Sequence, residues 1–332
     1  MLIDKNKMET DSSPRVLVLG GAGYIGAHVA HTLVESGYSI RIFDNFSNGL
    51  WRRVKDKFAD VVVGDVLDRN ALVSCLKGIY SVIHLVAKKS VEESVADPLK
   101  YYENNVGGTL NLLAAMAINN VKRLIFSSTA AVYAPTSKFR IDEDDPVGPL
   151  SPYGATKLMS EELIGSVGSA EGISAISLRY FNVAGASKIE FGDNSKDNLV
   201  PKVFAAIQRG DEPEIYGNDY PTIDGTCVRD YIHVGDLADA HLVALKRVEE
   251  VVVNEVYNVG SGTGYSVQEV MHQISDSVKK ELNPVHASRR AGDIPQLVAS
   301  ISKIESELGW KPKRTLKEMI DSAWASEEGN SR

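Results

Sequence analysis

A glycine-rich turn near the start of the sequence constrains the fold more than any other feature. The apolar run 16–19 leads into Gly20, and glycines recur at Gly23 and Gly26 before an amphipathic stretch begins. Glycine at these positions permits a tight turn and lets the backbone approach a pyrophosphate, and the helix that follows presents free N–H groups at the positive end of its dipole. The pattern predicts a strand, a dinucleotide-binding turn and a helix. A flexible turn without a ligand is the alternative interpretation.

An acidic residue follows the turn at the distance that a dinucleotide site requires. Asp44 ends the next predicted strand, eighteen residues after Gly26. A carboxylate there can hydrogen-bond the adenosine ribose hydroxyls and repel a 2′-phosphate, so it favours NAD over NADP. The alternative is that Asp44 is a turn residue before Asn45.

The first half of the chain alternates short β-branched runs with amphipathic stretches, as is typical of α/β proteins with a parallel sheet. Six strands with intervening helices indicate a Rossmann-type, doubly wound parallel sheet. The predicted strands are 16–19, 39–43, 61–63, 81–85, 123–127 and 173–178, and the predicted helices are 23–36, 70–76, 102–119 and 153–169.

The length of 332 residues suits about two domains of roughly 150 residues each. We expect a disordered leader at 1–13 and a Rossmann domain for NAD at 14–183. After about residue 185 the rhythm breaks into short segments rich in Gly, Pro and Asp, so we expect a smaller mixed α/β C-terminal substrate domain at 184–326. The alternative that part of 228–250 rejoins the first sheet stays open.

The composition excludes several classes of partner. Acidic residues outnumber basic ones by 44 to 36, and a net charge of −8 argues against a nucleic-acid or anionic-membrane surface. No apolar run approaches the roughly 20 residues of a membrane span. Two cysteines, Cys75 and Cys227, do not make a disulfide framework, so we expect a reducing, cytoplasmic compartment. The seven histidines show no metal-ligand spacing, so we expect no metal.

A tyrosine and a lysine are spaced to act as a catalytic pair. Ser151 and Pro152 suit a helix start, which places Tyr153 and Lys157 four residues apart on one helical face. An ammonium beside a phenol lowers the phenol pKa from about 10 and makes the tyrosine a usable base. The predicted strand before this helix continues into Thr129, whose hydroxyl we expect to contact the substrate hydroxyl that Tyr153 deprotonates. Simple capping of the strand end is the alternative role for Thr129.

These motifs resemble the UDP-glucose (UDP-galactose) 4-epimerases, which belong to the extended short-chain dehydrogenase/reductase superfamily. The resemblance extends from about residue 15 to residue 324. It is carried by GGAGYIGAH from Gly20, DNFSNG from Asp44, ESVADPLKYYENNVGGT from Glu93, SPYGATK from Ser151, RYFNVAGA from Arg179, YGNDYPTIDGTCVRDYIHVGDLADAH from Tyr216 and RRAGDIP from Arg289. Leu19, Ala27 and Ala134 depart from the family pattern and affect the expected details of NAD packing.

The resemblance implies that NAD is the cofactor and that Tyr153 is the base, with Lys157 as its partner and Thr129 beside the reacting hydroxyl. By the same matching, the cofactor site comprises Gly20, Gly23, Tyr24, Ile25, Gly26, Asp44, Asn45, Ser47, Asn48, Asp65, Val66, Leu85, Val86, Ala87, Lys89, Asn104, Tyr153, Lys157 and Phe181.

The resemblance also implies a UDP-sugar substrate held largely by the second half of the chain. The expected substrate residues are Thr129, Asn182, Asn198, Leu199, Tyr216, Arg229, Arg290, Asp293 and Leu297. Two arginines suit a diphosphate, and Asp293 can accept from ribose hydroxyls. The alternatives are an ion pair of Arg229 with Asp230 or Asp236, and a solvated loop at 289–293.

The implied reaction is reversible, NAD-dependent inversion at C4 of a UDP-hexose through a 4-keto intermediate. One rival is another enzyme of the superfamily, such as an epimerase of a different UDP-sugar or a 4,6-dehydratase. The dehydratases usually carry an Asp-Glu pair directly after the strand-end Thr, whereas Ala130 and Ala131 follow Thr129 here. The rival from another class is a non-catalytic NAD-sensing protein, but such proteins commonly lose the Tyr–Lys pair.

Two finer expectations follow from the resemblance. The residue four after Asp293, Leu297, lines the hexose pocket in the family, where tyrosine is associated with exclusion of N-acetyl sugars and a small residue with their admission. Leucine predicts slower but measurable turnover of N-acetylated substrates; ordinary core packing of Leu297 is the alternative. Helices 102–119 and 153–169 resemble those that pair in family dimers, so we expect a homodimer.

Overall fold

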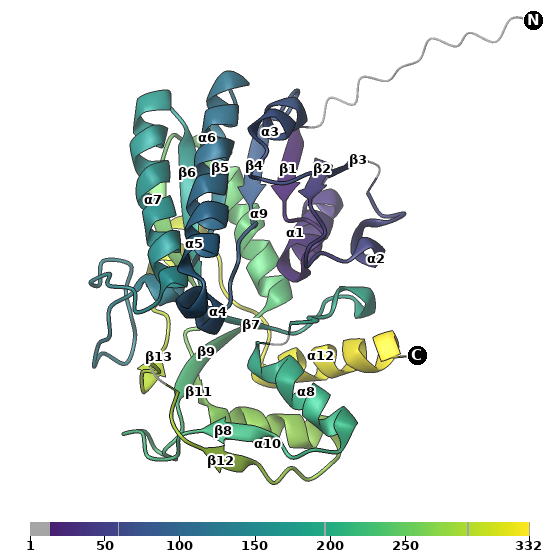
Figure 1. The fold of residues 1–332 in the computed structure, drawn as a ribbon, viewed down its shortest axis with the longest axis vertical. Coiled ribbons are helices and arrows are strands. Elements are labelled where there is room, and N and C mark those ends of the chain that lie inside the picture. Colours follow the sequence, from purple (N-terminus) through teal and green to yellow (C-terminus); the bar gives the residue numbers. More distant parts are fainter. Residues whose placement is uncertain (1–13, 59, 196, 291, 332) are drawn as a thin grey trace, which may run out of the picture.

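The fold is that of a computed structural model, in which residues 14–331 except 59, 196 and 291 are described. The expected leader at 1–13 lies outside the described residues. A large parallel sheet flanked by helices is joined to a smaller group of strands and helices that includes the C-terminal helix (Figure 1). Within the described part of the chain, every helix is too short or too polar to cross a membrane.

The large sheet has seven parallel strands in the order β10-β6-β5-β4-β1-β2-β3. The order reverses between β1 and β4, which is the switch point of a doubly wound dinucleotide-binding sheet, so the predicted fold class is confirmed. The strands are β1 (Arg15–Leu19), β2 (Ser39–Asp44), β3 (Asp60–Val63), β4 (Ser81–His84), β5 (Arg123–Thr129), β6 (Ser174–Tyr180) and β10 (Asn254–Val259).

Alternate residues of β1 pack into different hydrophobic clusters, because successive side chains of a strand point to opposite faces. Val16 and Val18 pack with α1 (Tyr24–Glu35) and α9 (Val234–Glu250). Leu17 and Leu19 pack with α3 (Arg69–Cys75), α6 (Gly108–Ile118) and α7 (Pro152–Glu171). Helices therefore cover both faces, as the near-continuous apolar strands predict.

The predicted helix 102–119 consists of two parts. A π-helical segment, η1 (Tyr102–Gly107), precedes α6 and follows two short helices, α4 (Val91–Ala96) and α5 (Pro98–Tyr101). π-Helical turns commonly occur at functional sites. Short helices also occur at α2 (Trp51–Val54), η2 (Ala130–Val132) and η3 (Ile189–Phe191).

The smaller part of the molecule contains two further sheets. β9 (Val228–His233) pairs with β7 (Asn182–Ala184), β11 (Gly264–Ser266) and β13 (Gln296–Leu297), and β8 (Glu214–Tyr216) pairs with β12 (Val285–Ala287). Helices α8 (Leu199–Arg209), α10 (Val267–Val278) and α12 (Leu316–Ser331) share a hydrophobic cluster with these strands.

Segment 228–259 connects the two parts of the molecule. β9 pairs only with strands of the smaller part among the described residues, whereas α9 packs on the large sheet and β10 becomes its seventh strand beside β6. The sequence analysis did not predict β10, whose six residues include Asn254, Glu255 and Asn258. The two-domain division at residue 183 stays a prediction.

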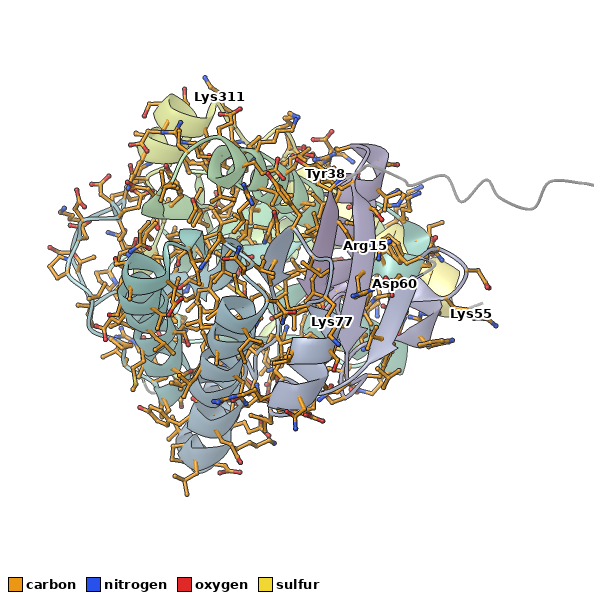
Figure 2. All side chains as sticks on the ribbon, turned by 90° about the horizontal axis from the view of Figure 1, so that it is seen from above. Arg15, Tyr38, Lys55, Asp60, Lys77 and Lys311 are labelled. Carbon is orange, nitrogen blue, oxygen red and sulfur yellow. The ribbon has the colours of Figure 1, made fainter. Side chains whose placement is uncertain are left out.

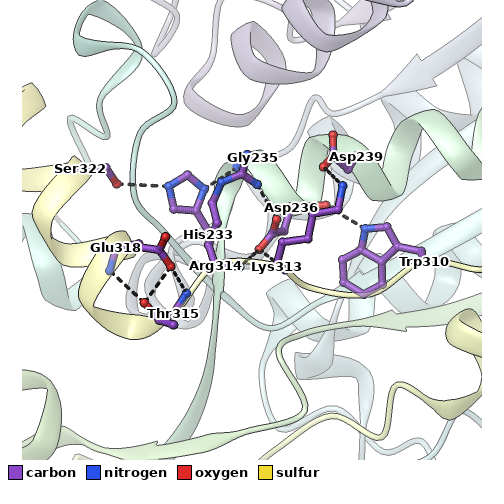
Figure 3. Close-up of polar contacts among 10 residues, drawn as sticks. All are labelled: His233, Gly235, Asp236, Asp239, Trp310, Lys313, Arg314, Thr315, Glu318 and Ser322. Carbon is purple, nitrogen blue, oxygen red and sulfur yellow. Dashed lines mark hydrogen bonds and ion pairs between the residues drawn. The ribbon is translucent and has the colours of Figure 1, made fainter.

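The start of α9 is tied to the segment before α12 by Asp236, which is 1% exposed (Figure 3). Its carboxylate accepts from the backbone N–H groups of Lys313 and Arg314, both at 3.0 Å, and forms an ion pair with the Arg314 guanidinium. The Asp236 carbonyl accepts from Trp310 Nε1 at 3.1 Å. A single carboxylate thus holds the chain that leads from α11 (Ser302–Leu308) to α12.

A second carboxylate, Asp60, lies at the amino end of β3 beside Arg15 (Figure 2). It accepts from Arg41 Nε at 2.8 Å and lies 3.7 Å from Arg15 Nη1. Partly exposed ion pairs of this kind contribute about 0–1 kcal/mol to stability. They join the first three strands at the edge opposite the predicted site.

Candidate active site

The glycine turn forms a cradle that a larger residue would fill. Gly20 has a φ of +80°, and a Cβ at Gly26 would lie 2.1 Å from the Gly20 carbonyl oxygen. Gly23 is the N-cap of α1, and no side chain caps this helix end. The backbone can therefore bring the uncapped N–H groups of the first turn against a pyrophosphate. The cradle fits the predicted dinucleotide.

Asp44 braces this turn through its side chain. Its carboxylate accepts from the backbone N–H of Ala22 at 2.9 Å and of Phe46 at 2.8 Å, and the residue is 6% exposed. Burial raises the pKa of Asp44, while these two N–H groups and Arg53 oppose the rise. The bond to Phe46 is the turn role considered in the sequence analysis. Selection of NAD by Asp44 stays a prediction.

Two predicted cofactor residues are linked across the carboxyl ends of β2 and β3. Asn45 donates from Nδ2 to Asp65 Oδ2 at 2.8 Å, and Asp65 Oδ1 accepts from the backbone N–H of Leu67 at 2.9 Å. Ser47 and Asn48 follow in an exposed loop, and Val66 is buried. The structure brings these residues to the edge of the sheet where the glycine turn lies.

The loop after β4 contains the predicted residues Leu85, Val86, Ala87 and Lys89, and it is held by a residue that sequence reasoning missed. Asn105, in η1, accepts from the Lys88 N–H at 2.8 Å and donates to the Lys88 carbonyl at 3.0 Å. It also donates to Thr156 Oγ1 at 3.0 Å and accepts from the predicted Asn104. The pair of asparagines in the YYENNVGGT segment is the signal for this role.

Two of the predicted cofactor side chains point elsewhere. The Tyr24 hydroxyl donates to the Gly185 carbonyl at 2.6 Å and is buried, so only the backbone of Tyr24 can face the turn. Ile25 packs on the hydrophobic cluster shared with α9. The contacts of two further predicted cofactor residues are with other segments of the chain. Lys89 donates to Ser195 Oγ at 3.3 Å, and Phe181 packs in a cluster with Ala130 and Leu297.

Tyr153, Lys157 and Thr129 come together at the carboxyl end of β5. Ser151 caps α7 by accepting from the Gly154 N–H at 3.2 Å, which sets the start of the helix one residue before Tyr153. The Thr129 side chain faces the Tyr153 hydroxyl and lowers its pKa. Thr129 Oγ1 also accepts from the Ala131 N–H at 3.2 Å, which is the capping role considered in the sequence analysis. Lys157 Nζ donates to the Ser127 carbonyl at 2.6 Å and to Ser127 Oγ at 3.2 Å.

The surroundings of this pair oppose charge. Burial lowers the pKa of Lys157 to about 7, and the Glu161 carboxylate one turn further along α7 raises it. Burial also raises the pKa of Tyr153, whereas the hydrogen bond with Thr129 lowers it. The phenol is thus a base only where enough positive charge surrounds it. The predicted geometry is present, and its electrostatics depend on the groups around Lys157.

Arg229 and Asp293, two predicted substrate residues, contact one another. Arg229 Nη2 lies 3.4 Å from Asp293 Oδ1, and Nη1 donates to the Ile294 carbonyl at 2.9 Å. The alternative ion pairs of Arg229 with Asp230 or Asp236 are not formed. Asp230 accepts from backbone N–H groups of 261, 262 and 299, and Asp236 pairs with Arg314.

The other predicted substrate residues surround this pair. The Arg290 guanidinium carbon lies 3.9 Å from the centre of the Tyr216 ring, so these two stack. Leu297 pairs in register with Arg229 through β13 and β9. Asn182 hydrogen-bonds Tyr231, Asn198 donates to Asp193 Oδ2 at 2.7 Å, and Leu199 begins α8. Among the described residues, no group of three or more His, Cys, Asp or Glu side chains is arranged to hold a metal ion.

Comparisons with known proteins show the family to which the chain belongs. The NAD dependent epimerase/dehydratase family matches residues 16–260. A UDP-glucose 4-epimerase of Bacillus subtilis is 43% identical over 329 residues, which cover 95% of this chain and 97% of that protein.

Solved structures of the same kind also match over nearly the whole chain. A UDP-glucose 4-epimerase from Stenotrophomonas maltophila, with bound NAD and formylated UDP-arabinopyranose, superposes with a TM-score of 0.92 at 35% identity, covering 96% of this chain and 99% of that one. The enzyme from Bifidobacterium longum, in complex with NAD⁺ and UDP, superposes with a TM-score of 0.89 at 38% identity, covering 96% and 99%. The chain belongs to the NAD dependent epimerase/dehydratase family and, within it, to the UDP-glucose 4-epimerases.

Proposed function

We propose that this protein catalyses the reversible, NAD-dependent inversion at C4 of a UDP-hexose, interconverting UDP-glucose and UDP-galactose through a 4-keto intermediate. The observation that carries the proposal is the contact of Tyr153 with Thr129 and of Lys157 with Ser127, at the sheet edge where the glycine cradle also lies. A relative that is 43% identical and covers nearly the whole chain supports it.

NAD fits the site because the turn at Gly20 leaves no side chain between the backbone and a pyrophosphate, and the start of α1 is uncapped. Asp44 and the linked pair of Asn45 and Asp65 lie where they would meet an adenosine ribose. NAD bound in this cradle would supply a reversible hydride acceptor for C4. Because the cofactor ends the cycle unchanged, no net oxidant is consumed.

The chain's own residues move the proton. Tyr153 accepts the proton of the C4 hydroxyl, with Thr129 hydrogen-bonded to the same phenol and able to orient that hydroxyl. The Lys157 ammonium stabilises the phenolate that this requires. Tyr153 then returns the proton to the C4 oxygen after the sugar has presented its other face.

The UDP end would be held by the smaller part of the molecule. Arg229 and Arg290 supply positive charge for a diphosphate, and Asp293 supplies an acceptor for ribose hydroxyls. Tyr216, Asn182, Asn198 and Leu199 complete the proposed substrate residues. Binding energy from this end retains the keto sugar while it turns over.

The proposal also ranks the sugars that the protein accepts and the related activities that compete with C4 epimerisation of UDP-glucose. Leu297 packs beside Phe181 in one hydrophobic cluster, so its size bears on the space near the sugar. The Stenotrophomonas maltophila structure holds formylated UDP-arabinopyranose, which favours an epimerase of another UDP-sugar as the second candidate. A 4,6-dehydratase is disfavoured because buried Ala130 follows Thr129 in place of an acid.

A homodimer is proposed through helices 102–119 and 153–169. Apolar side chains on these helices are exposed, among them Leu110 at 47%, Ile118 at 66% and Met159 at 43%. We also propose a cytoplasmic location, because Cys75 and Cys227 are both free and buried.

The direct test is a panel of UDP-sugars incubated with purified protein and followed by NMR for inversion at C4. UDP-galactose is expected to equilibrate with UDP-glucose without added oxidant. Absence of turnover by NAD-loaded protein on every sugar of the panel would contradict the proposal and favour the NAD-sensing alternative.

A further inference from the structure

A chain of hydrogen bonds leads from Lys157 to helix α9 on the other face of the large sheet. Lys157 Nζ is 3.2 Å from Ser127 Oγ, and the Tyr180 hydroxyl bonds His241 Nε2. Between them, on the neighbouring strands β5 and β6, the Ser127 hydroxyl interacts with the Tyr180 hydroxyl in the sense that lowers the pKa of Tyr180. His241 Nδ1 is 2.8 Å from the Leu237 carbonyl. The exposed fractions of the four side chains are 3%, 6%, 8% and 0% from Lys157 to His241, so water does not compete for these bonds.

The chemistry of the last link sets the direction of the whole chain. A carbonyl oxygen only accepts, so His241 Nδ1 carries the proton that Leu237 receives. Burial lowers the pKa of His241 to about 4, so the ring is neutral and its Nε2 accepts. Tyr180 must then donate to His241, Ser127 must donate to Tyr180, and Ser127 Oγ is left to accept from Lys157.

We propose that His241 and Tyr180 are positioning residues, which hold the Ser127 hydroxyl as an acceptor for the Lys157 ammonium through a one-way hydrogen-bond chain across the sheet. The inference rests on the proposed function in one respect, the support that Lys157 gives to Tyr153. It assigns a role to α9, which contributes none of the residues predicted for the site.

Apart from Glu161, the groups that face Lys157 from β5, β4 and α7 carry no fixed charge, so they leave a role for the Ser127 hydroxyl in stabilising the ammonium. From β5 come the Ser127 carbonyl and the Phe126 ring, whose centre is 4.7 Å from Nζ. From β4 comes His84, whose pKa is lowered to about 3 by burial and further by Lys157, so it is neutral. Tyr153 on α7 becomes a charged partner of Lys157 only as the phenolate, and burial, which raises its pKa, opposes that form.

Glu161 on α7 is the charged group that favours the ammonium, but its charge is shared. Its carboxylate accepts from Arg179 Nε at 3.0 Å and from Nη2 at 2.7 Å, and it also accepts from the Ser128 hydroxyl. Glu161 raises the pKa of Lys157 through its charge, whereas Ser127 Oγ contacts the Lys157 Nζ directly. The orientation of the Ser127 hydroxyl therefore matters to the charge of Lys157.

Replacing His241 removes the acceptor that fixes which hydroxyl donates and which accepts between His241 and Lys157. Tyr180 would then be free to donate towards Ser127, and Ser127 towards Lys157, which favours the neutral amine. The pKa of Lys157 is expected to fall, and that of Tyr153 to rise with the loss of the positive charge. Both limbs of the pH profile of kcat/KM should move inwards, the acidic limb upwards and the basic limb downwards.

The first experiment does not depend on turnover. Long-range ¹H–¹⁵N correlation spectra of ¹⁵N-histidine-labelled protein report the tautomer of each ring, and the signals of His241 are those missing from His241→Gln. We expect the neutral Nδ1–H form from pH 5 to pH 8. An Nε2–H tautomer or a cationic ring in that range would overturn the proposal, whether or not the protein is an epimerase.

The second experiment compares pH profiles of matched variants. His241→Leu removes the acceptor, and we expect each limb to move by about one pH unit, which corresponds to a tenfold change in the protonation equilibrium. His241→Gln places an amide oxygen near the position of Nε2, so the wild-type limbs should return. His272→Leu, at an exposed position of α10, controls for the loss of a histidine.

If His241→Leu does not fold, Tyr180→Phe carries the same test because it removes one oxygen atom from the chain. Limbs that stay in place while kcat falls would show that these residues act only on packing, and would overturn the proposal. Equal shifts in His241→Gln and His241→Leu would do the same. Loss of wild-type turnover on all UDP-sugars would instead contradict the proposed function.

Discussion

At the scale of single residues, the proposed base lies in surroundings that oppose its ionisation. Burial raises the pKa of Tyr153 and lowers that of Lys157 to about 7, so it opposes both the phenolate and the ammonium. Thr129 and Glu161 act in the other direction. An enzyme with this arrangement should be sensitive to each group that favours the phenolate and the ammonium.

Tyr153→Phe is expected to keep the fold and the cofactor but to reduce kcat by about 10²–10⁴-fold, because it removes a general base. Lys157→Met should also lose activity and should raise the pH at which the remainder is observed. The measurement is kcat against pH, with the melting temperature and bound NAD as controls for folding. Near wild-type epimerisation by Tyr153→Phe would show that another group is the base.

Asp44 has a structural role and a proposed selective role that a pair of substitutions separates. Asp44→Ala leaves the N–H groups of Ala22 and Phe46 without their acceptor, which should lower the free energy of unfolding by about 1–3 kcal/mol. Both Asp44→Ala and Asp44→Asn remove the charge that repels a 2′-phosphate, so both should bind NADP relatively better. Asn keeps an acceptor oxygen and should lose less stability. Unchanged cofactor preference in both variants would leave Asp44 with the turn role alone.

At the scale of elements, β13 and the start of α9 position residues that lie outside the glycine turn and the Tyr–Lys pair. β13 contains only two residues, but its pairing with β9 sets Leu297 beside Arg229 and against the cluster of Phe181. Asp236, at the start of α9, holds the segment that leads to α12 (Figure 3). Both segments act through pairing with distant parts of the chain.

Leu297→Tyr tests whether β13 limits the size of the sugar. The unmodified protein should convert UDP-N-acetylglucosamine measurably but more slowly than UDP-glucose. The tyrosine should abolish the acetylated activity and spare the plain hexose, since the larger ring takes the space of the acetamido group. Equal loss of both activities, or no acetylated turnover by the unmodified protein, would mean that Leu297 is ordinary core.

Asp236→Ala is expected to destabilise the protein by about 2–3 kcal/mol, because it leaves Arg314 and two backbone N–H groups without their buried acceptor. Urea unfolding measures this change. Asp239→Ala is the matched control, since Asp239 makes only a partly exposed pair with Lys313. Equal, small changes in the free energy of unfolding for both substitutions would show that Asp236 does not hold α9 and α12 together.

At the scale of the whole molecule, the sequence predicted the elements that carry a periodic hydrophobic pattern. It did not predict features that depend on contacts between segments far apart in the sequence. The six strands and the helices α1, α3, α6 and α7 of the first 180 residues follow from local periodicity, whereas the short helices α2, α4 and α5 were not predicted. The contact of Tyr153 with Thr129 follows from strand order. β10 was missed because a six-residue edge strand with polar residues carries little periodicity. Asn105 was missed because its role requires the loop after β4 to lie beside η1. The ion pair of Arg229 with Asp293 joins residues 64 apart, which local spacing does not reveal.

The central claim is that Tyr153 moves only the proton of the C4 oxygen, while the hydrogen on C4 leaves and returns within one site. UDP-galactose labelled with deuterium at C4, incubated with the protein in ordinary water and analysed by NMR and mass spectrometry, tests this directly. We predict UDP-glucose that retains the deuterium at C4 with no exchange into solvent. Product with hydrogen from water at C4 would contradict the account.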